Sequence, residues 1–286
     1  MDTLYHYCST KSFLDIISSR AIRLSSLSLS NDTMEGQLVS RIFERFLEQS
    51  DIDAEEKEYV RDTIEFVEGM FDGLGFCLSE KPDTLSQWRG YADDGRGFSI
   101  GFSKSYLDAL SKEGTTDKPR FRLDRVLYKQ SEHEAVLRPI FEKILTRIRS
   151  GELKQHCHRG IFDFLPEAEK EKRLAIYKKS KGTLMLQFLP AFPKVHILKN
   201  SAFSEEYEWR LISYFSKSSD ANVSFNASGD RLIPYREFKL MPVGANAINT
   251  IYVGPKNITP KFVIERILAK YEYTNVTIMR SSATYR

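Results

Sequence analysis

Apolar positions along the chain follow two different spacings. Near the start, Phe13, Leu14, Ile16 and Ile17 recur on one helical face, which predicts an amphipathic helix after a short first strand. Elsewhere the apolar residues form short runs bounded by Gly, Pro, Asn or Asp, a pattern that is typical of strands. We expect strands at 5–7, 21–24, 75–79, 97–102, 121–128, 195–199, 203–215, 222–226, 231–238, 248–254 and 275–279.

Helices interrupt this series of strands, and most of them fall in two long excursions at about 33–72 and 131–182. In the second excursion, the apolar residues from Val136 to Ile148 recur at helical spacing. No repeat and no low-complexity linker divides the sequence. We therefore expect a single α+β domain over residues 1–286, built on mixed, mostly antiparallel sheets. Helices are expected at 34–48, 54–70, 82–91, 136–148, 166–181 and 260–270.

Charge is unevenly distributed along the chain, although the net charge is only +3. Residues 44–72 carry eleven acidic and three basic side chains, whereas residues 141–185 carry eleven basic and six acidic ones. A basic surface attracts anions, so residues 141–185 are a candidate surface for a nucleic-acid or protein acceptor. The simpler interpretation is that both segments are solvated helix faces.

The composition favours a protein of a reducing compartment. No apolar stretch approaches the roughly 20 residues that a membrane span requires, and Asp2, His6 and Asp15 interrupt any signal peptide. Three cysteines at scattered positions do not form a disulfide framework. The alternating His156, Cys157 and His158 lack a second ligand pair at zinc-finger spacing. We therefore expect a cytoplasmic protein with no membrane partner and no structural metal.

Polar side chains with catalytic potential lie at the ends of predicted strands. His6 ends the first strand, where its imidazole could donate to a ribose hydroxyl or a diphosphate, although backbone groups could equally satisfy it. Glu206 and Glu208 are two residues apart on the predicted strand 203–215, which places both on one face, roughly 6–7 Å apart. The alternative is an edge strand whose charges prevent aggregation.

Aromatic and small polar residues extend this candidate site. Trp88 and Tyr91 are three residues apart on a predicted helix, and either ring could stack on nicotinamide or adenine. Aromatic side chains at this spacing are also typical of a core. Tyr7 and Ser79 are further candidates for lining a pocket. A polar cluster is formed by Asn31, Asp32 and Glu35. It is typical of a helix cap, and it could also hold a ligand.

Five segments resemble an uncharacterised bacterial domain family, several members of which lie among phage-defence genes. They span the chain from end to end. These segments are 4–36 (with HYCS and NDTMEG), 75–102 (GFCLSEKPDTLSQWRGYADDGRGFSIGF), 206–211 (EYEWRL), 251–255 (IYVGP) and 280–286 (RSSATYR).

The first three of these segments are also similar, in their order, to the motifs of ADP-ribosyltransferase toxins that modify DNA, which suggests that they form one common site. The resemblance implies an ADP-ribosyltransferase-like fold, NAD as substrate, and a toxin or defence role. It makes Glu208 the catalytic residue at the nicotinamide ribose and Glu206 the residue facing the acceptor, with His6 also at the reaction centre. NAD would contact His6 and the other cofactor-binding candidates, which are Tyr7, Ser79, Trp88 and Tyr91. The Ser-Thr-Ser triplet of that family is missing here.

Two other classes of function stay open at this level. One is a binding or sensor module that keeps a nucleotide pocket without catalysis. The other is a nucleic-acid-processing protein, in which the basic residues 141–185 bind the nucleic acid and Glu206, Glu208 and an aspartate hold magnesium. The leading hypothesis is an NAD-consuming ADP-ribosyltransferase or NAD glycohydrolase.

Overall fold

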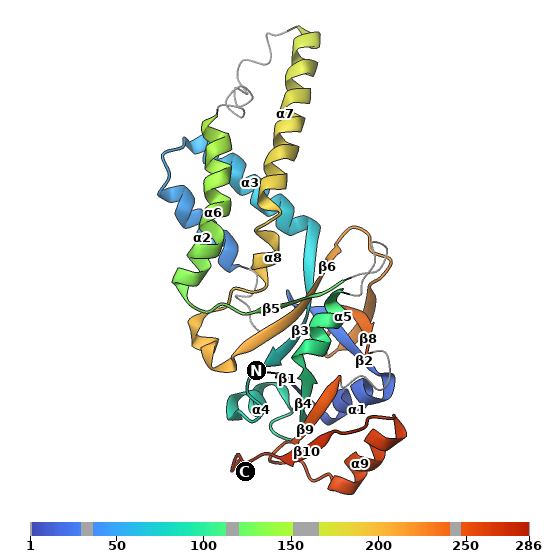
Figure 1. Ribbon diagram of the computed structural model, residues 1–286. Coiled ribbons are helices and arrows are strands. Elements are labelled where there is room, and N and C mark those ends of the chain that lie inside the picture. Colours follow the sequence, from blue (N-terminus) through green and yellow to red (C-terminus); the bar gives the residue numbers. More distant parts are fainter. Residues whose placement is uncertain (1, 30–36, 113–119, 151–165, 241–246, 286) are drawn as a thin grey trace.

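The structure is a computed structural model that describes residues 2–29, 37–112, 120–150, 166–240 and 247–285. It has the expected α+β architecture, in which a mixed, mostly antiparallel sheet is combined with several helices (Figure 1). The strands are β1 (Thr3–Cys8), β2 (Ala21–Ser26), β3 (Phe71–Ser79), β4 (Phe98–Ser103), β5 (Arg122–Arg125), β6 (Glu208–Ser216), β7 (Ser224–Ser228), β8 (Arg231–Lys239), β9 (Ile248–Val253) and β10 (Thr277–Arg280).

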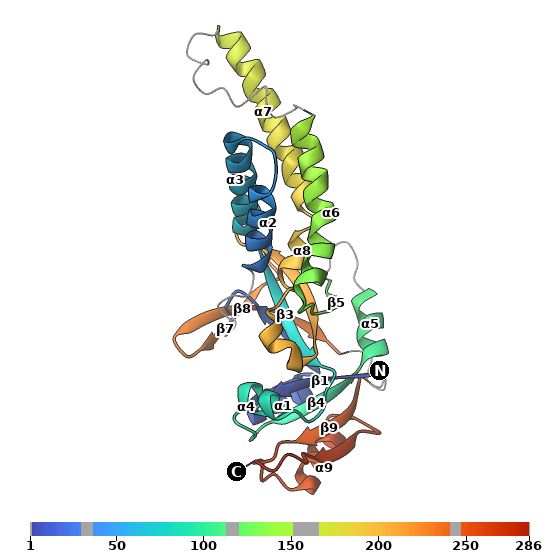
Figure 2. The same ribbon diagram turned by 90° about the vertical axis from the view of Figure 1, so that its left-hand side faces the viewer.

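The helices lie in two regions (Figures 1 and 2). Around the sheet are α1 (Thr10–Ser19), α4 (Leu85–Tyr91), α5 (Lys104–Lys112) and α9 (Lys261–Lys270). At one end of the sheet stand α2 (Leu38–Glu48), α3 (Ala54–Met70), α6 (Gln130–Arg149), α7 (Glu167–Phe188) and α8 (Phe192–Val195). The second group corresponds to the two helical excursions expected from the sequence, and its members pack on one another around a separate hydrophobic cluster that includes Phe43, Phe141 and Phe188.

The main hydrophobic cluster lies within the sheet and under its helices. Strand β4 contributes Phe98, Ile100 and Phe102, which are at most 1 % exposed. Helix α1 begins where the Ser9 hydroxyl accepts a hydrogen bond from the backbone N–H of Ser12 at 3.1 Å. This cluster fixes the strands that bear the candidate site, because each of them contributes buried apolar residues to it.

The strand order is β10-β9-β4-β1-β3-β2-β8-β7, with β6 pairing β3 and β5. Antiparallel pairs predominate, and β9 and β10 run parallel. Strand β6 pairs the whole length of β3 along one edge, from Phe71↔Ser216 to Ser79↔Glu208. The other edge is shared, because β2 pairs with Gly75 and Leu74 while β1 pairs only with Ser79. Strands β1 and β2 therefore separate alongside residues 76–78 of β3.

Two segments expected as strands have a different structure. Residue 195 ends the short helix α8, and residues 196–199 contribute one isolated bridge, between Leu127 and Leu198. Residues 201–206 form a 3₁₀ helix, η3 (Ser201–Glu206), so that strand β6 begins only at Glu208. The Asn200 side chain accepts a hydrogen bond from the N–H of Ala202 and starts this helix, and Tyr207 ends it in the left-handed region at φ 46°.

Candidate active site

A cavity of about 440 Å³ lies where β1 and β2 separate along β3. Its lining includes Phe76, Cys77 and Leu78, the stretch of β3 between its pairings with β1 and β2, together with residues of α1. The structure brings His6, Tyr91, Glu206 and Glu208 to this one cavity. The three sequence segments that suggested a common site therefore meet, although about 200 residues separate the first from the last.

His6 lies at the edge of the cavity on β1 and stacks on the Phe76 ring, with 3.9 Å between ring centroids. Its Nδ1 is 2.8 Å from the carbonyl oxygen of Cys77. Since a carbonyl only accepts, Nδ1 carries the hydrogen and donates, and in the neutral ring Nε2 is an acceptor. Burial lowers the pKa of His6 to about 4, although the Cys77 bond opposes this. Because the single N–H of the neutral ring already donates to Cys77, His6 can accept a hydrogen bond from a ribose hydroxyl through Nε2 but cannot donate to a ribose hydroxyl or a diphosphate, in contrast to the expectation.

We expect the His6 imidazole to remain neutral from pH 8 down to about pH 5 because its pKa is lowered to about 4. NMR titration of ¹⁵N-histidine-labelled protein, with His6→Asn to identify the signal, measures this directly. The Nδ1-protonated tautomer should be visible throughout that range. A midpoint near 6.5, the ordinary value for histidine, would show that the ring is not held as described.

Glu206 and Glu208 do not lie on a common strand face, in contrast to the expectation. Glu206 is the last residue of η3, Tyr207 adopts a left-handed conformation, and Glu208 is the first residue of β6. Both carboxylates are nevertheless buried, with Glu206 8 % and Glu208 5 % exposed. Strand β6 pairs β3 and β5 on its two edges. The interpretation of these charges as protection of a solvent-facing edge strand is therefore wrong.

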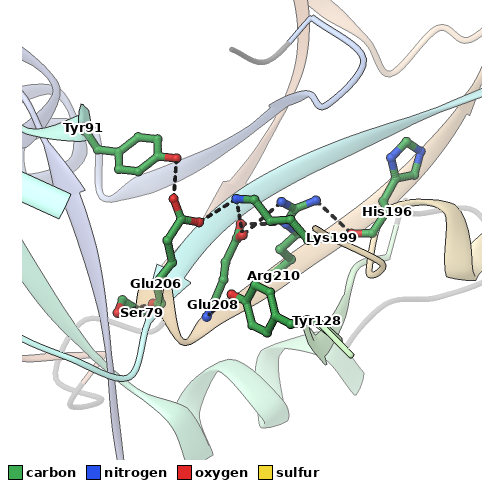
Figure 3. A network of polar contacts seen from close by, with 8 residues as sticks. All are labelled: Ser79, Tyr91, Tyr128, His196, Lys199, Glu206, Glu208 and Arg210. Carbon is green, nitrogen blue, oxygen red and sulfur yellow. Dashed lines mark hydrogen bonds and ion pairs between the residues drawn. The ribbon is translucent and has the colours of Figure 1, made fainter. Parts of the chain in front are cut away.

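Lys199 joins the two carboxylates (Figure 3). Its Nζ donates to Glu206 Oε2 at 2.5 Å and to Glu208 Oε2 at 2.9 Å. Arg210 holds Glu208 from the other side, with Nε 2.6 Å from Oε1 and Nη2 3.0 Å from Oε2. Two carboxylates and two cations thus form one hydrogen-bonded group against the cavity, and their formal charges cancel. Such compensation is what permits ionised groups to be buried.

The group holds its members in their charged forms. Burial opposes the ionisation of Glu208, but Arg210 and Lys199 outweigh it and lower the pKa of Glu208 to about 2. Burial likewise disfavours the ammonium of Lys199, yet the neighbouring Glu208 and Glu206 raise its pKa above the usual range. Glu208 is therefore an anion over the whole physiological pH range.

Backbone and side-chain contacts hold this group in place. Arg210 Nη1 donates to the carbonyl oxygen of His196 at 2.9 Å. The imidazole of His196 packs against Gly73, where an added Cβ would lie 2.3 Å from a ring carbon, so only glycine fits. The backbone N–H of Glu208 donates to the Tyr128 hydroxyl oxygen at 2.9 Å. Three segments distant in sequence thus fix the start of β6.

Tyr91 and Gln87 reach the cavity from helix α4. The Tyr91 hydroxyl donates to Glu206 Oε1 at 3.0 Å, and burial raises the pKa of this phenol. Gln87 is only 7 % exposed, and among the described residues its side-chain amide makes no hydrogen bond. Because Gln87 lines the cavity and its amide is not used within the described part of the protein, it is a candidate for binding a polar group of a ligand.

Three of the residues expected to contact a cofactor already use their polar groups in hydrogen bonds within the protein. Trp88 is fully buried and donates from Nε1 to Asp83 Oδ1 at 2.6 Å. Ser79 is 2 % exposed, and its hydroxyl donates to the backbone carbonyl of Glu206 at 2.7 Å. Neither of them lines the cavity. Tyr7 does line it, but its hydroxyl already donates to the carbonyl of Lys81 and accepts from the N–H of Thr84.

Sequence reasoning did not identify Lys199 or Gln87. A signal existed for Lys199, because it directly follows Ile197 and Leu198 in the expected strand 195–199, and a lysine beside buried residues is rarely unpaired. Within the described ranges, no group of three or more His, Cys, Asp or Glu side chains is arranged to hold a metal ion. No helix described by the structure is long and apolar enough to cross a membrane. Predictions that fall outside the described residues concern Asn31, Asp32, Glu35, His156, Cys157 and His158.

Comparison with known protein families is consistent with an uncharacterised family. A family model described as "Protein of unknown function (DUF2971)" matches residues 87–211. The match begins at Gln87 and ends one residue after Arg210, so it contains α4 from Gln87 onwards, Lys199 and both glutamates. The expected resemblance to a domain family of unknown function is confirmed over this part of the chain. No curated protein and no solved structure matches the sequence.

Proposed function

We propose that the protein is an NAD-consuming enzyme, either an ADP-ribosyltransferase or an NAD glycohydrolase, acting as a toxin or defence effector. The observation that supports this most is the meeting of His6, Tyr91, Glu206 and Glu208 at one cavity. These residues come from the three segments whose order resembles that of ADP-ribosyltransferases. The α+β architecture with a mostly antiparallel sheet is compatible with the same class.

The chemistry of the site is suited to cleavage of the nicotinamide–ribose bond. As this C–N bond breaks, its electron pair leaves with the nicotinamide nitrogen and the ribose becomes a cation resembling that of glycoside hydrolysis. We assign Glu208 to stabilise this cation, because its lowered pKa keeps it ionised. The Nε2 atom of His6 accepts a hydrogen bond from a ribose hydroxyl, and Gln87 binds a polar group of the cofactor.

Glu206 serves the acceptor in this proposal. Water or a nucleophile of the acceptor forms the new bond to the anomeric carbon, and Glu206 takes the proton that it releases. Tyr91 and Lys199 hold the two oxygens of this carboxylate in place. The same Lys199 contact disfavours the magnesium alternative, since its ammonium lies against both carboxylates that would bind the ion.

NAD labelled with ³²P in its adenylate phosphate tests the proposal. The protein is incubated with this NAD alone, with single-stranded DNA, with RNA and with cell extract. Free labelled ADP-ribose indicates hydrolysis, and label on a macromolecule indicates transfer. Binding of NAD without conversion would instead support the sensor alternative. If the protein neither binds nor converts NAD, the proposal is contradicted.

The basic residues 141–185 are proposed to contact the acceptor. Helix α7 carries Lys172 and Lys179, both exposed. Reversing these two charges should weaken binding of a nucleic-acid acceptor about tenfold or more at low salt, with a shallower salt dependence, because fewer phosphate charges are neutralised. Hydrolysis of NAD without acceptor should be unchanged. Binding is measured by fluorescence anisotropy, with Lys172→Arg/Lys179→Arg as the matched control.

Loss of NAD turnover in the charge-reversed protein, with its fold intact by circular dichroism, would place these residues at the cofactor and contradict this assignment. Unchanged acceptor binding would show that the two lysines are only part of a solvated helix face.

A further inference from the structure

Helix α4, which carries Tyr91 and Gln87 to the cavity, has little local structure to hold it. It has seven residues, whereas isolated helices shorter than about 12–15 residues are marginal in water. Thr84 at its start forms no side-chain cap. After its end, Asp93 and Asp94 have positive φ of 48° and 53°. The position of α4 therefore depends on contacts with other parts of the chain.

One set of contacts joins residues 281 and 282 to Asp83, two residues before α4. Asp83 Oδ1 accepts from the Ser281 hydroxyl at 2.5 Å and from Trp88 Nε1 at 2.6 Å. Asp83 Oδ2 accepts from the backbone N–H of Ser282 at 2.7 Å and from its hydroxyl at 2.8 Å. Burial opposes the ionisation of Asp83, but these hydrogen bonds lower its pKa. Hydrogen bonds to an ionised carboxylate are among the strong ones.

A second set of contacts acts just beyond the other end of α4. The Tyr285 hydroxyl donates to Asp94 Oδ1 at 2.7 Å, and Lys256 Nζ donates to Asp94 Oδ2 at 2.8 Å. The same ammonium lies 3.8 Å from the centroid of the Tyr285 ring. Between these anchors, Ala283 packs against the cluster formed by Tyr7 and Trp88. Residues 281–285 thus bridge both flanks of the helix, and none of them lines the cavity.

We propose that residues 281–285 are a strap that fixes α4 and thereby positions Tyr91 and Gln87 at the cavity. Ser281, Ser282 and Tyr285 are positioning residues, because they act on the site through α4 and the hydrogen bond from Tyr91 to Glu206. Any effect of this positioning on catalysis rests on the proposed function. The effect of the strap on the position of Tyr91 does not, and it can be measured without a substrate.

The test is a triple variant, Ser281→Ala/Ser282→Ala/Tyr285→Phe, in the full chain labelled with [¹³Cζ]tyrosine. Tyr91→Phe identifies the Tyr91 signal, and Thr284→Ala is the matched control, since Thr284 is exposed within the same segment. In the unaltered protein and the control, Tyr91 should titrate above the usual range, because burial raises its pKa. In the triple variant its midpoint should fall by one pH unit or more towards the ordinary value of about 10.

Amide hydrogen exchange provides the second measurement. The triple variant should exchange about tenfold or more faster across residues 84–95, while β4 and β6 keep their protection. An unchanged Tyr91 titration, or faster exchange spread evenly over the sheet, would overturn the proposal. Neither measurement needs NAD, so failure of the strap and failure of the NAD hypothesis are distinguishable. If NAD is the substrate, the variant should also show a higher KM for NAD.

Discussion

Replacing Arg210 by methionine is expected to lower the free energy of unfolding by about 3–5 kcal/mol. Arg210 is 1 % exposed, and it donates two hydrogen bonds to the buried carboxylate of Glu208. Methionine fills a similar volume but leaves Lys199 as the only cation among the described residues that contacts Glu208. An ionised carboxylate left partly uncompensated in the interior is strongly unfavourable.

Urea unfolding at pH 7 measures this effect. The double variant Glu208→Gln/Arg210→Met should recover a large part of the loss, because it removes both charges together. Arg231→Met is a suitable control, since Arg231 is exposed and its ion pair with Asp230 lies at the surface. A loss below about 1 kcal/mol for Arg210→Met would mean that the pair is not buried and compensated as described.

The same interaction predicts how stability depends on pH. The pKa of Glu208 is about 2 in the folded protein, below its ordinary value of 4.5. The unfolded chain therefore binds the proton more readily, and Glu208 contributes stability that is present above pH 4.5 and lost as the pH falls towards 2. The contribution is about 3 kcal/mol. In Arg210→Met the pKa of Glu208 should lie closer to 4.5, because the neighbouring charge that lowers it most is removed. The pH range over which Glu208 stabilises the fold should therefore be narrower.

Replacing Glu208 by glutamine is expected to reduce NAD hydrolysis at least about a hundredfold, about 3 kcal/mol of transition-state stabilisation. Glutamine keeps the shape of the side chain but removes the charge that stabilises the ribosyl cation. Glu206→Gln should instead reduce transfer to an acceptor and spare hydrolysis. Initial rates of ADP-ribose formation, measured on protein shown to be folded at the assay temperature, separate the two roles.

Glu205 offers a matched control for these substitutions. It is the neighbour of Glu206 in η3, but it is exposed, so Glu205→Gln should leave both activities unchanged. Loss of hydrolysis in Glu206→Gln but not in Glu208→Gln would reverse the roles. Unchanged activity in both variants of a protein that consumes NAD would exclude the pair from catalysis.

The elements of this fold could largely be predicted where the hydrophobic period is long and regular. The helices in the two excursions and the strands β3, β4, β8 and β9 lie close to their expected positions. The expected strand 203–215 was placed too early because the alternation of apolar and polar residues from Tyr207 to Leu211 was extended backwards, whereas the Asn200 cap and the left-handed Tyr207 make residues 201–206 a 3₁₀ helix. Side-chain capping and a single positive φ there override the periodicity.

Only part of the candidate site could be predicted from the sequence. His6, Tyr91 and the two glutamates carry chemistry that stands out at strand or helix ends. The position of Lys199 beside buried residues indicated that it has a partner, but the identity of that partner could not be predicted, since it depends on η3 turning Glu206 back towards the lysine. Trp88 and Ser79 were expected to contact a ligand because their types suit a pocket, but hydrogen bonds to Asp83 and Glu206 hold them within the protein. Such contacts are set by tertiary packing and not by local spacing.

The most direct test of NAD consumption is the release of nicotinamide, followed by ¹H NMR after mixing the purified protein with NAD. The proposal predicts nicotinamide formation by the unaltered protein and by Glu205→Gln, and at least about a hundredfold slower formation by Glu208→Gln. Intact NAD after prolonged incubation with the folded protein, with and without nucleic-acid and protein acceptors, would contradict it.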